Sequence, residues 1–372
     1  MQVSIERSTL QTLLGHAQNV VERRTTIPIL SNLRLLADGS RLEITATDME
    51  LTIHEGADAQ VQAEGATTVP AHTLHDIVRK LPGEAKIELR QEPNSSEITV
   101  TSGRAVFTLP TLPAADFPAM GGESFEHRFS LSAADLKALI DKTRFAISNE
   151  EARYYLNGIH FHVRKSGATS ALRAVATDGH RLARMEVGMP EGAADIPPVI
   201  VHKKTVAEMR RLLDDADEEV EISLSSNRIQ MKAGSAVLVS RLVDGTFPDY
   251  ERVIPANNDK QLVIDAKAFT STVDRVATIA TEKTRAIKLG IAPGKLTVSA
   301  ISTTAGRGIE ELDAGYQSDA MEIGFNSRYI LEMMQQVEGD NVEMDLASPA
   351  APTLVRDPGD DRAIFVLMPM RV

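Results

Sequence analysis

Hydrophobic periodicity divides the chain into alternating strands and amphipathic helices. The first strand alternates apolar and polar residues from Val3, and a stripe at i, i+3, i+4 spacing follows it. We expect this first helix over residues 9–24, with Ser8 as its N-cap and Arg23 and Arg24 at its end. The stripe consists of Leu10, Leu13, Leu14, Ala17, Val20 and Val21.

This strand-and-helix pattern occurs three times along the chain. Residues 3–10 resemble residues 129–136 and 262–269 in the order of their apolar and polar positions. The tripeptide Ala-Thr-Asp at 46–48 recurs at 176–178, which is 130 residues later. A period of this length is too long for a solenoid repeat and long enough for a small domain with its own core. The sequence therefore predicts three related modules.

Each module is predicted to combine two helices with antiparallel strands. Alternating segments joined by turns such as Asp38-Gly39 predict strand hairpins between the helices. We expect an α+β fold of three domains, residues 1–122, 123–250 and 251–372. The expected strands include 30–37, 41–47, 49–54, 86–91, 97–102, 105–109, 156–164, 171–177 and 181–188, and the further helices are 72–80, 132–144, 203–213, 266–285 and 327–337.

The composition is that of a globular protein and excludes several kinds of site. The chain is 42% hydrophobic and 25% charged and has no run of 18 apolar residues, so we expect no membrane-spanning segment and no membrane partner. Cysteine is absent, which excludes disulfides, thiolate metal sites and a cysteine nucleophile. The chain begins with the first strand and shows no basic, apolar leader, so we expect a cytoplasmic protein.

Positive charge is concentrated in the predicted helices. The net charge is −12, which by itself argues against nucleic acid as a partner. In the six helical windows, however, Lys and Arg outnumber Asp and Glu by 16 to 8, so the remainder of the chain carries −20. This segregation fits solvated helix faces, and it also fits a basic helical surface that faces nucleic acid.

No complete catalytic or metal-binding motif is present. His160 and His162 share one face of a predicted strand, and Asp178 and His180 flank Gly179 in a predicted turn. These residues keep a metal-dependent hydrolase centred on Asp178 and His180 open as an alternative. The chain lacks a Gly-x-Ser-x-Gly elbow and a glycine-rich phosphate loop, so we expect no catalytic residue, metal or cofactor.

Two other segments suggest binding. Tyr154 and Tyr155 lie between a helix and a strand, where they are either buried or free to contact a phosphate backbone or bases. The C-terminal run from Val366 to Val372 is largely apolar, although chain ends are usually polar. This run is either a strand that completes a sheet or also the wall of a peptide site, in which Met side chains adapt to varied ligands.

Seven longer strings, distributed over the whole chain, form a specific combination. They are Thr26-Ile27-Pro28-Ile29-Leu30-Ser31-Asn32, Leu112-Pro113-Ala114-Ala115-Asp116-Phe117-Pro118, Arg153-Tyr154-Tyr155-Leu156-Asn157-Gly158, Ala176-Thr177-Asp178-Gly179-His180-Arg181-Leu182, Phe247-Pro248-Asp249-Tyr250, Glu322-Ile323-Gly324-Phe325-Asn326 and Met368-Pro369-Met370-Arg371. In this order they resemble one known family, the bacterial sliding clamp or β subunit of DNA polymerase III.

The resemblance implies three clamp domains of like fold per chain and two chains joined head to tail in a ring-shaped homodimer. Helices would line the hole and face double-stranded DNA, and the acidic sheets would lie outside. Weak, sequence-independent phosphate contacts suffice for a ring that encloses DNA and slides along it. The implied function is that of a non-catalytic processivity factor in DNA replication, which tethers the replicative polymerase, the clamp loader and repair proteins through short hydrophobic-aromatic motifs. A peptide-binding scaffold that does not bind DNA is the remaining alternative.

The resemblance also implies site residues, position by position. DNA contacts fall on Arg24, Tyr154 and Tyr155, and on two positions that depart from the family pattern, where His72 replaces an arginine and Glu150 a neutral amide. The implied dimer-interface residues are Arg104, Phe107, Leu109 and Ile279, and the implied client-peptide residues are Leu156, Thr177, Gly179, His180, Arg181, Leu182, Pro248, Val253, Val366, Met368, Pro369, Met370 and Arg371.

Overall fold

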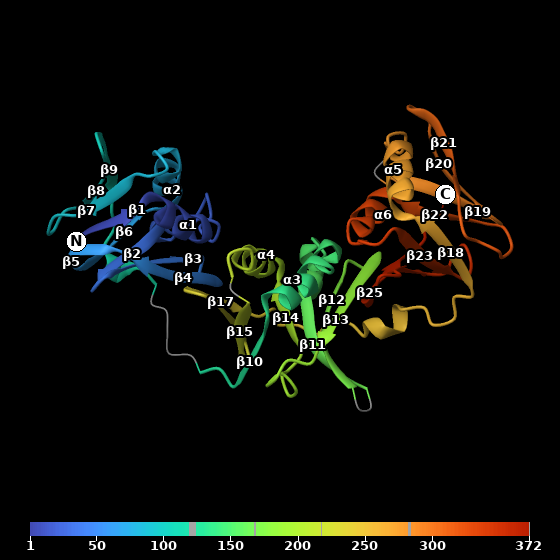
Figure 1. Ribbon diagram of the computed structural model, residues 1–372, viewed down its shortest axis with the longest axis horizontal. Helices are drawn as coiled ribbons and strands as arrows, with labels where there is room; N and C mark the ends of the chain where they lie inside the picture. Colours follow the sequence, from blue (N-terminus) through green and yellow to red (C-terminus); the bar gives the residue numbers. More distant parts are fainter. Residues whose placement is uncertain (119–123, 167–168, 217, 282–283, 372) are drawn as a thin grey trace. The chain divides into compact units, whose positions relative to one another are not determined.

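The described residues form α-helices, short 3₁₀ helices and antiparallel strands in four sheets (Figure 1). The computed structural model describes residues 1–118, 124–166, 169–216, 218–281 and 284–371. The chain has two compact units: unit 1 consists of Met1–Ala134, Pro190–Asp195 and Lys204–Leu242, and unit 2 of Asp135–Met189, Ile196–Lys203 and Val243–Val372.

The first module lies in unit 1 and confirms the predicted order of its elements. A strand was expected at 41–47, where β3 lies, and the second helix, α2, begins directly after Pro70. The elements are β1 (Gln2–Glu6), α1 (Arg7–Ala17), η1 (Pro28–Ser31), β2 (Asn32–Asp38), β3 (Arg41–Thr47), β4 (Leu51–Asp58), β5 (Gln60–Ala63), β6 (Gly65–Pro70), α2 (Ala71–Lys80), β7 (Lys86–Arg90), β8 (Glu97–Ser102), β9 (Ala105–Pro110) and η2 (Ala114–Asp116).

The second and third modules repeat this order of strands and helices. The second comprises β10 (His127–Ser132), α3 (Ala133–Asp141), η3 (Arg144–Ala146), η4 (Glu151–Leu156), β11 (Gly158–Ser166), β12 (Thr169–Thr177), β13 (Arg181–Gly188), β14 (Val199–His202), α4 (Lys203–Leu212), β15 (Glu219–Leu224), β16 (Arg228–Ala233) and β17 (Ala236–Arg241). After η5 (Tyr250–Val253), the third comprises β18 (Lys260–Asp265), α5 (Ala266–Ala277), β19 (Ala286–Ala292), β20 (Lys295–Ser302), β21 (Gly306–Asp313), β22 (Met321–Asn326), α6 (Ser327–Met334), β23 (Asn341–Leu346), β24 (Thr353–Asp357) and β25 (Asp360–Leu367).

The first helix does not begin as predicted. Ser8 lies inside α1, and the N-cap position belongs to Glu6, which makes no side-chain capping bond. The backbone N–H of Arg7 instead donates to the carbonyl oxygen of Ala85 at 2.9 Å. A tertiary contact therefore satisfies a free N–H of the first turn that a local cap was expected to satisfy.

Several helices also end earlier than predicted. The helix α1 ends at Ala17, and Arg24 lies beyond it in a bend rather than in its last turn. Val20 and Val21 nevertheless stay buried, so the apolar pattern continues after the helix has ended. Likewise α5 ends at Ala277 instead of 285, a predicted span in which residues 282–283 lie outside the described part. The apolar pattern of the sequence, used without other signals, therefore predicts helices that are too long.

Each module buries one apolar face of its helices against its sheets. In the first module α1 and α2 lie against each other, and α1 also contacts β3 and β4 (Figure 1). Leu10, Leu14 and Leu74 are fully buried there, and each such side chain contributes roughly 1.5–3 kcal/mol. In the third module, Phe269 and Val273 of α5 are equally buried. All six residues of the stripe predicted for the first helix are buried, which confirms that stripe as core.

The sheets show the threefold repeat in their strand order. One four-stranded ladder runs β1-β7-β8-β9 in the first module, β10-β15-β16-β17 in the second and β18-β23-β24-β25 in the third. The other runs β6-β2-β3-β4, β14-β11-β12-β13 and β22-β19-β20-β21. Every pairing in these ladders is antiparallel. The fold is α+β with three repeated clamp-type domains.

The hairpin turns of the first two modules are built alike. The Thr47 hydroxyl donates to the carbonyl oxygen of Leu51 at 3.2 Å, and the Thr177 hydroxyl donates to that of Arg181 at 2.7 Å. In both turns an aspartate at the next position accepts two backbone N–H groups. The repeated Ala-Thr-Asp therefore marks a repeated turn with a structural role.

Adjacent modules share sheets. The last strand of the second module, β17, pairs with β4 of the first, and β25 of the third pairs with β13 of the second. Each pairing merges two four-stranded ladders into an eight-stranded sheet. Half of the second module therefore falls into unit 1 and half into unit 2. The predicted boundary at 122/123 lies outside the described residues, and the exact domain bounds 1–122, 123–250 and 251–372 remain a prediction.

No helix in the described part of the chain is long and apolar enough to cross a membrane.

The close approach of β11 to β14 leads to a stability prediction. A Cβ on Gly158 would overlap the carbonyl oxygen of Val201, whereas a Cβ on Gly188 would meet no atom within 4 Å. We expect Gly158→Ala to lower the free energy of unfolding by roughly 1–3 kcal/mol through overpacking. Gly188→Ala should change it by less than about 0.5 kcal/mol. Chemical denaturation of both variants tests this, and equal stability would contradict the tight strand contact.

Candidate functional site

An apolar cluster in unit 2 collects side chains from distant parts of the sequence. Leu156 ends η4, Leu182 is the second residue of β13, and Val366 lies in β25; all three are buried. Leu182 and Val366 are directly opposite in the β13–β25 ladder, so strand pairing brings them together. The whole apolar cluster consists of Leu156, Val175, Leu182, Ile200, Phe247, Tyr250 and Val366, with Tyr155, Val243, Ile254 and Leu354 packed against it.

The turn between β12 and β13 borders this apolar cluster and is rigidly built. Asp178 Oδ1 accepts the backbone N–H groups of His180 and Arg181 at 2.9 and 3.0 Å. Gly179 has φ +88°, a conformation that favours glycine, and a Cβ there would lie 2.7 Å from Arg153 Nη1. The side chain of His180 is exposed and stacks on Tyr329, with ring centroids 6.2 Å apart.

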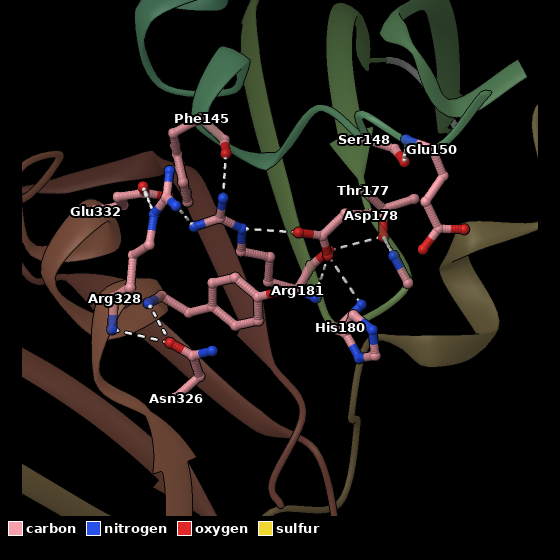
Figure 2. A network of polar contacts seen from close by, with 12 residues as sticks. Phe145, Ser148, Glu150, Thr177, Asp178, His180, Arg181, Asn326, Arg328 and Glu332 are labelled. Atoms are coloured by element: carbon pink, nitrogen blue, oxygen red, sulfur yellow. Dashed lines mark hydrogen bonds and ion pairs between the residues drawn. The ribbon is translucent and has the colours of Figure 1, made fainter. Parts of the chain in front are cut away.

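Arg181 is the centre of a polar network beside this turn (Figure 2). Its guanidinium donates to Asp178 Oδ2 at 3.1 Å and to the carbonyl oxygen of Phe145 at 2.5 Å, and it pairs with Glu332 Oε2 at 2.5 Å. The same group lies over the ring of Tyr329, 4.4 Å from its centroid. Because Arg181 is buried, its charge binds the turn to α6 and η3 and does not face solvent.

The network continues onto α6. Asn326 caps this helix, since its Oδ1 accepts the N–H groups of Arg328 and Tyr329. Burial raises the pKa of Glu332, but hydrogen bonds from Arg328 and Arg181 outweigh that effect and hold the pKa below its usual range. Burial raises the pKa of Tyr329. Because its pKa is lowered, the Glu332 carboxylate stays charged between Arg328 and Arg181.

The C-terminal run does complete a sheet, which confirms one of the two explanations for its apolar character. β25 pairs with β13 on one side and β24 on the other. Beyond it, the Met368 N–H donates to the His180 carbonyl oxygen and the Met370 N–H to that of Gly324, both at 2.9 Å. Met368 and Arg371 are exposed, and Val372 lies outside the described residues.

The segment around η5 supplies the remaining predicted client residues. Phe247 and Tyr250 are buried in the apolar cluster, while Pro248 and Val253 between and after them are exposed. The predicted client residues therefore fall into buried, half-buried and exposed sets, all within unit 2. The buried residues are Leu156, Thr177, Arg181, Leu182 and Val366, the half-buried ones Pro369 and Met370, and the exposed ones Gly179, His180, Pro248, Val253, Met368 and Arg371.

Sequence reasoning missed several members of the site. Phe247 and Tyr250 belong to the apolar cluster, and both lie in the quoted string Phe247-Pro248-Asp249-Tyr250, which was the sequence signal for this segment. Tyr329 lies in the predicted helix 327–337 and was not named as a site residue, yet it is half-buried and contacts both His180 and Arg181. No spacing in the sequence connects Tyr329 with residues almost 150 positions earlier.

The two adjacent tyrosines have different environments. Tyr154 is 53% exposed, whereas Tyr155 packs against the apolar cluster. Nearby, Glu150 is exposed and forms two hydrogen bonds with Arg153, at 2.6 and 2.7 Å, which hold the pKa of Glu150 below its usual range. Arg153 in turn donates to the Asp178 carbonyl oxygen at 3.2 Å. Tyr154 is therefore the more exposed tyrosine of the pair.

The other predicted nucleic-acid residues lie in unit 1. Arg24 is exposed after α1, and His72 of α2 is partly buried, with its Nε2 3.0 Å from the carbonyl oxygen of Val21. Near them is a surface cavity of about 520 Å³ lined by Arg23, His72, Thr73, Asp76, Ile77, Lys80, Leu81 and Phe107. Arg24 is thus free to contact a ligand, while His72 has a structural hydrogen bond.

The alternative of a metal-dependent hydrolase receives no support from this geometry. Both oxygens of Asp178 are used in its own turn, and His180 lies on Tyr329. His160 stacks on His162, and burial lowers the pKa of His160 to about 4. Within the described ranges, no group of three His, Cys, Asp or Glu residues could hold a metal ion.

Comparison with known proteins covers the entire chain. Three family models match in sequence: the N-terminal domain of the DNA polymerase III beta subunit at residues 1–121, the central domain at 130–249 and the C-terminal domain at 251–371. A beta sliding clamp of Caulobacter vibrioides is 48% identical over 372 residues, with both chains fully covered. The beta sliding clamp of Escherichia coli is 38% identical over 376 residues, again with full coverage of both.

Solved structures agree with the sequence relatives. A Caulobacter crescentus beta sliding clamp has a TM-score of 0.97 at 48% identity, covering 100% of this chain and 99% of that one. A sliding clamp from Bartonella birtlesii bound to griselimycin has a TM-score of 0.97 at 44% identity, with both chains fully covered. The chain therefore belongs to the family of DNA polymerase III beta subunits, the beta sliding clamps.

Proposed function

We propose that two copies of this chain close head to tail into a ring around double-stranded DNA and hold client proteins on it. As a member of its family the chain is a processivity subunit of DNA polymerase III and not an enzyme. The proposed clients are the replicative polymerase, the clamp loader and repair proteins, and the proposed location is the cytoplasm. The observation that carries the proposal is the pattern of strand pairing between modules.

Two strand edges in the chain lack the neighbour that their equivalents have. The last strands of the three modules are β9, β17 and β25. Across a junction, β17 pairs with the hairpin strand β4, and β25 pairs with the hairpin strand β13. The third hairpin strand is β21. In the described sheets, β9 and β21 both lie at an edge. Pairing β9 of one copy with β21 of another would satisfy both edges and, repeated once more, would close a ring.

The two internal junctions predict the register of this third junction. Leu238 of β17 lies opposite Ile53 of β4, and Phe365 of β25 lies opposite Ala183 of β13. When the paired positions are followed from strand to strand across each ladder, Leu238 and Phe365 fall at equivalent places in the last strands of their modules. Ile53 and Ala183 are equivalent in the hairpin strands. The same counting can therefore be applied to the two free edges.

On the free edges, the equivalent residues are Phe107 of β9 and Gly308 of β21. Pairing them would place Val106 opposite Ile309, whose side chains are 63% and 65% exposed in the single chain. Ile279 lies next to Gly308, and its Cγ1 is 3.1 Å from the position that a Cβ on Gly308 would take. In this register Ile279 approaches Phe107, which lines the surface cavity of unit 1. These contacts support the predicted interface.

The charge pattern supports duplex DNA as the enclosed ligand. α4 carries Lys203, Lys204, Arg210 and Arg211 with Glu208 as its acidic residue, although the chain as a whole has a net charge of −12. Basic helices on an acidic protein suit phosphate contact at one surface and repulsion elsewhere. Arg24 and Tyr154 are exposed, as a phosphate contact and a stacking contact require.

The apolar cluster of unit 2 supports the proposed client site. Its exposed border combines apolar residues, Pro248, Val253 and Met368, with the polar His180 and Arg371. An apolar surface with a few polar groups at its edge is typical of a peptide-binding site. Sliding clamps from Bartonella birtlesii and Pseudomonas aeruginosa have been solved with griselimycin bound. We infer that this chain binds griselimycin and short hydrophobic-aromatic peptides at the same surface.

The interface leads to a prediction about oligomeric state. The wild type should have twice the chain mass of 40.4 kDa in solution, and Ile279→Asp should yield monomers because it buries a charge without a partner. Sedimentation equilibrium at micromolar concentration measures both masses. Ile27→Asp is the control, since Ile27 is an isoleucine that is 51% exposed and belongs to neither β9 nor β21. A monomeric wild type would refute the ring.

The DNA surface leads to a prediction about salt dependence. Arg24→Ala should weaken duplex binding equally for all sequences and reduce the slope of log affinity against log salt by about one. Arg41→Ala, which removes a half-exposed arginine from β3, should leave the slope unchanged. Fluorescence anisotropy with several duplexes over a salt series provides the test. A loss confined to particular sequences would show base recognition and contradict a phosphate contact.

The C-terminal tail leads to a prediction about client binding. Truncation after Leu367 removes Met368 and Met370 from the proposed site, so griselimycin binding should be abolished while the dimer persists. A buried Leu or Phe of a ligand gains roughly 1.5–3 kcal/mol, which those methionines help to supply. Truncation after Arg371, which keeps Met368 to Arg371 in place, is the matched control and should retain binding. Calorimetric titration measures griselimycin binding, and sedimentation measures the mass of the dimer. If truncation after Leu367 also dissociates the dimer, the tail is chiefly structural.

A further inference from the structure

The segment that carries Pro248 and Val253 has little regular structure of its own. Between β17, which ends at Arg241, and β18, which begins at Lys260, the four residues of η5 are the only regular element. Pro248 and Val253 nevertheless form part of the border of the apolar cluster. A ligand-binding wall on an irregular segment needs fixed attachment points, because otherwise ordering the segment would cost binding free energy.

Aromatic stacking provides the first attachment of this segment to its sheet. The ring of Phe247 lies nearly parallel to that of His160, with centroids 4.7 Å apart and planes at 6°. His160 stacks in turn on His162, two residues further along β11. Burial lowers the pKa of both histidines, so both rings are neutral at neutral pH. Stacking alone leaves the segment free to slide along the ring faces.

Directional bonds from one buried arginine provide the second attachment. Arg173 of β12 is 6% exposed, and its Nη1 donates to the Tyr250 hydroxyl at 3.0 Å and to Glu251 Oε1 at 2.5 Å. His162 Nε2 lies 2.9 Å from the same hydroxyl. Tyr250 and Glu251 are the first two residues of η5. The bonds therefore determine where η5 begins, and with it the position of Val253 one turn later.

Arg173 is itself held rigidly in the sheet. Its Nε donates to Glu186 Oε1 of β13 at 2.5 Å, so the guanidinium connects β12, β13 and η5. Glu186 also lies near Arg164 and Arg184, at 3.4 and 3.6 Å, and would keep a positive neighbour if Arg173 were lost. Removing the Arg173 charge would therefore release η5 without leaving the Glu186 carboxylate unpaired in the sheet.

We propose that Arg173 is a positioning residue for client binding, which acts through Tyr250 and Glu251 to hold Pro248 and Val253 in place. This inference rests on the proposed function, in which clients bind at the apolar cluster. Arg173 is buried, and its guanidinium bonds to Tyr250 and Glu251, so it does not touch the ligand. Its loss should act on ligand affinity through the mobility of η5 rather than through a missing contact.

The experiment compares griselimycin affinity in variants of the full-length dimer. Arg173→Met should weaken binding about tenfold, the equivalent of one lost hydrogen bond to a charged group. Tyr250→Phe removes only the hydroxyl and should weaken binding less. The double variant should be no weaker than Arg173→Met, because both changes break the same connection. Arg173→Lys, which keeps a charged donor, should restore part of the affinity.

The matched control is Arg252→Met in the same 3₁₀ helix. Arg252 is 83% exposed at its side chain and pairs with Asp249 of the same segment at 2.6 Å, so its loss should leave affinity unchanged. A second readout is amide hydrogen exchange in the free protein. Arg173→Met should speed exchange at Ile254, whose N–H donates to the Glu251 carbonyl oxygen, and leave the β12–β13 ladder protected.

The outcomes separate this inference from the proposed function. If the wild type does not bind griselimycin, the client site is refuted, and the hydrogen exchange result alone decides whether Arg173 positions η5. If the wild type binds and Arg173→Met binds equally well, the inference is overturned. Equal losses from Arg252→Met, or faster exchange throughout the β12–β13 ladder, would also overturn it, since both would indicate a general structural effect. If Arg173→Met does not fold, Tyr250→Phe provides the same comparison.

Discussion

The pairing of one module's last strand with a hairpin strand of its neighbour is the interaction on which the rest of the structure depends. An antiparallel sheet leaves unpaired N–H and C=O groups along each edge, and these groups attract further strands. The β17–β4 and β25–β13 ladders satisfy such edges within the chain. They also explain why the compact units do not coincide with the sequence repeat, since each eight-stranded sheet belongs to two modules.

Both junctions are reinforced by partly or fully buried charges. At the β17–β4 junction, His16 bonds to Glu55 and Asp215, and the hydrogen bond to Glu55 chiefly raises the pKa of His16. At the β25–β13 junction, the buried Lys142 donates to the Gln336 carbonyl oxygen and to Glu338, both at 2.6 Å. Such paired charges cost desolvation but are directional, so they specify one arrangement of the neighbouring elements.

The proposed client surface depends on the same strand pairing. Leu182 and Val366 become neighbours only because β13 and β25 pair, and the tail that follows β25 then reaches the turn at His180. Polar networks around Arg181 and Arg173 hold the irregular segments that border the apolar cluster. Directional bonds thus lie behind the apolar surface that is proposed to bind clients.

The sequence alone determined the repeat, the order of strands and helices and the family, because apolar spacing and turn residues are local properties and the quoted strings are specific. It could not determine where α1 ends, since Val20 and Val21 are buried by tertiary contacts beyond the helix. Nor could it show that Arg181 is the buried centre of a polar network, or that Tyr250 and Tyr329 belong to the candidate client site. Those roles depend on which distant strands and helices become neighbours, and that choice is made by backbone pairing and packing of the whole fold.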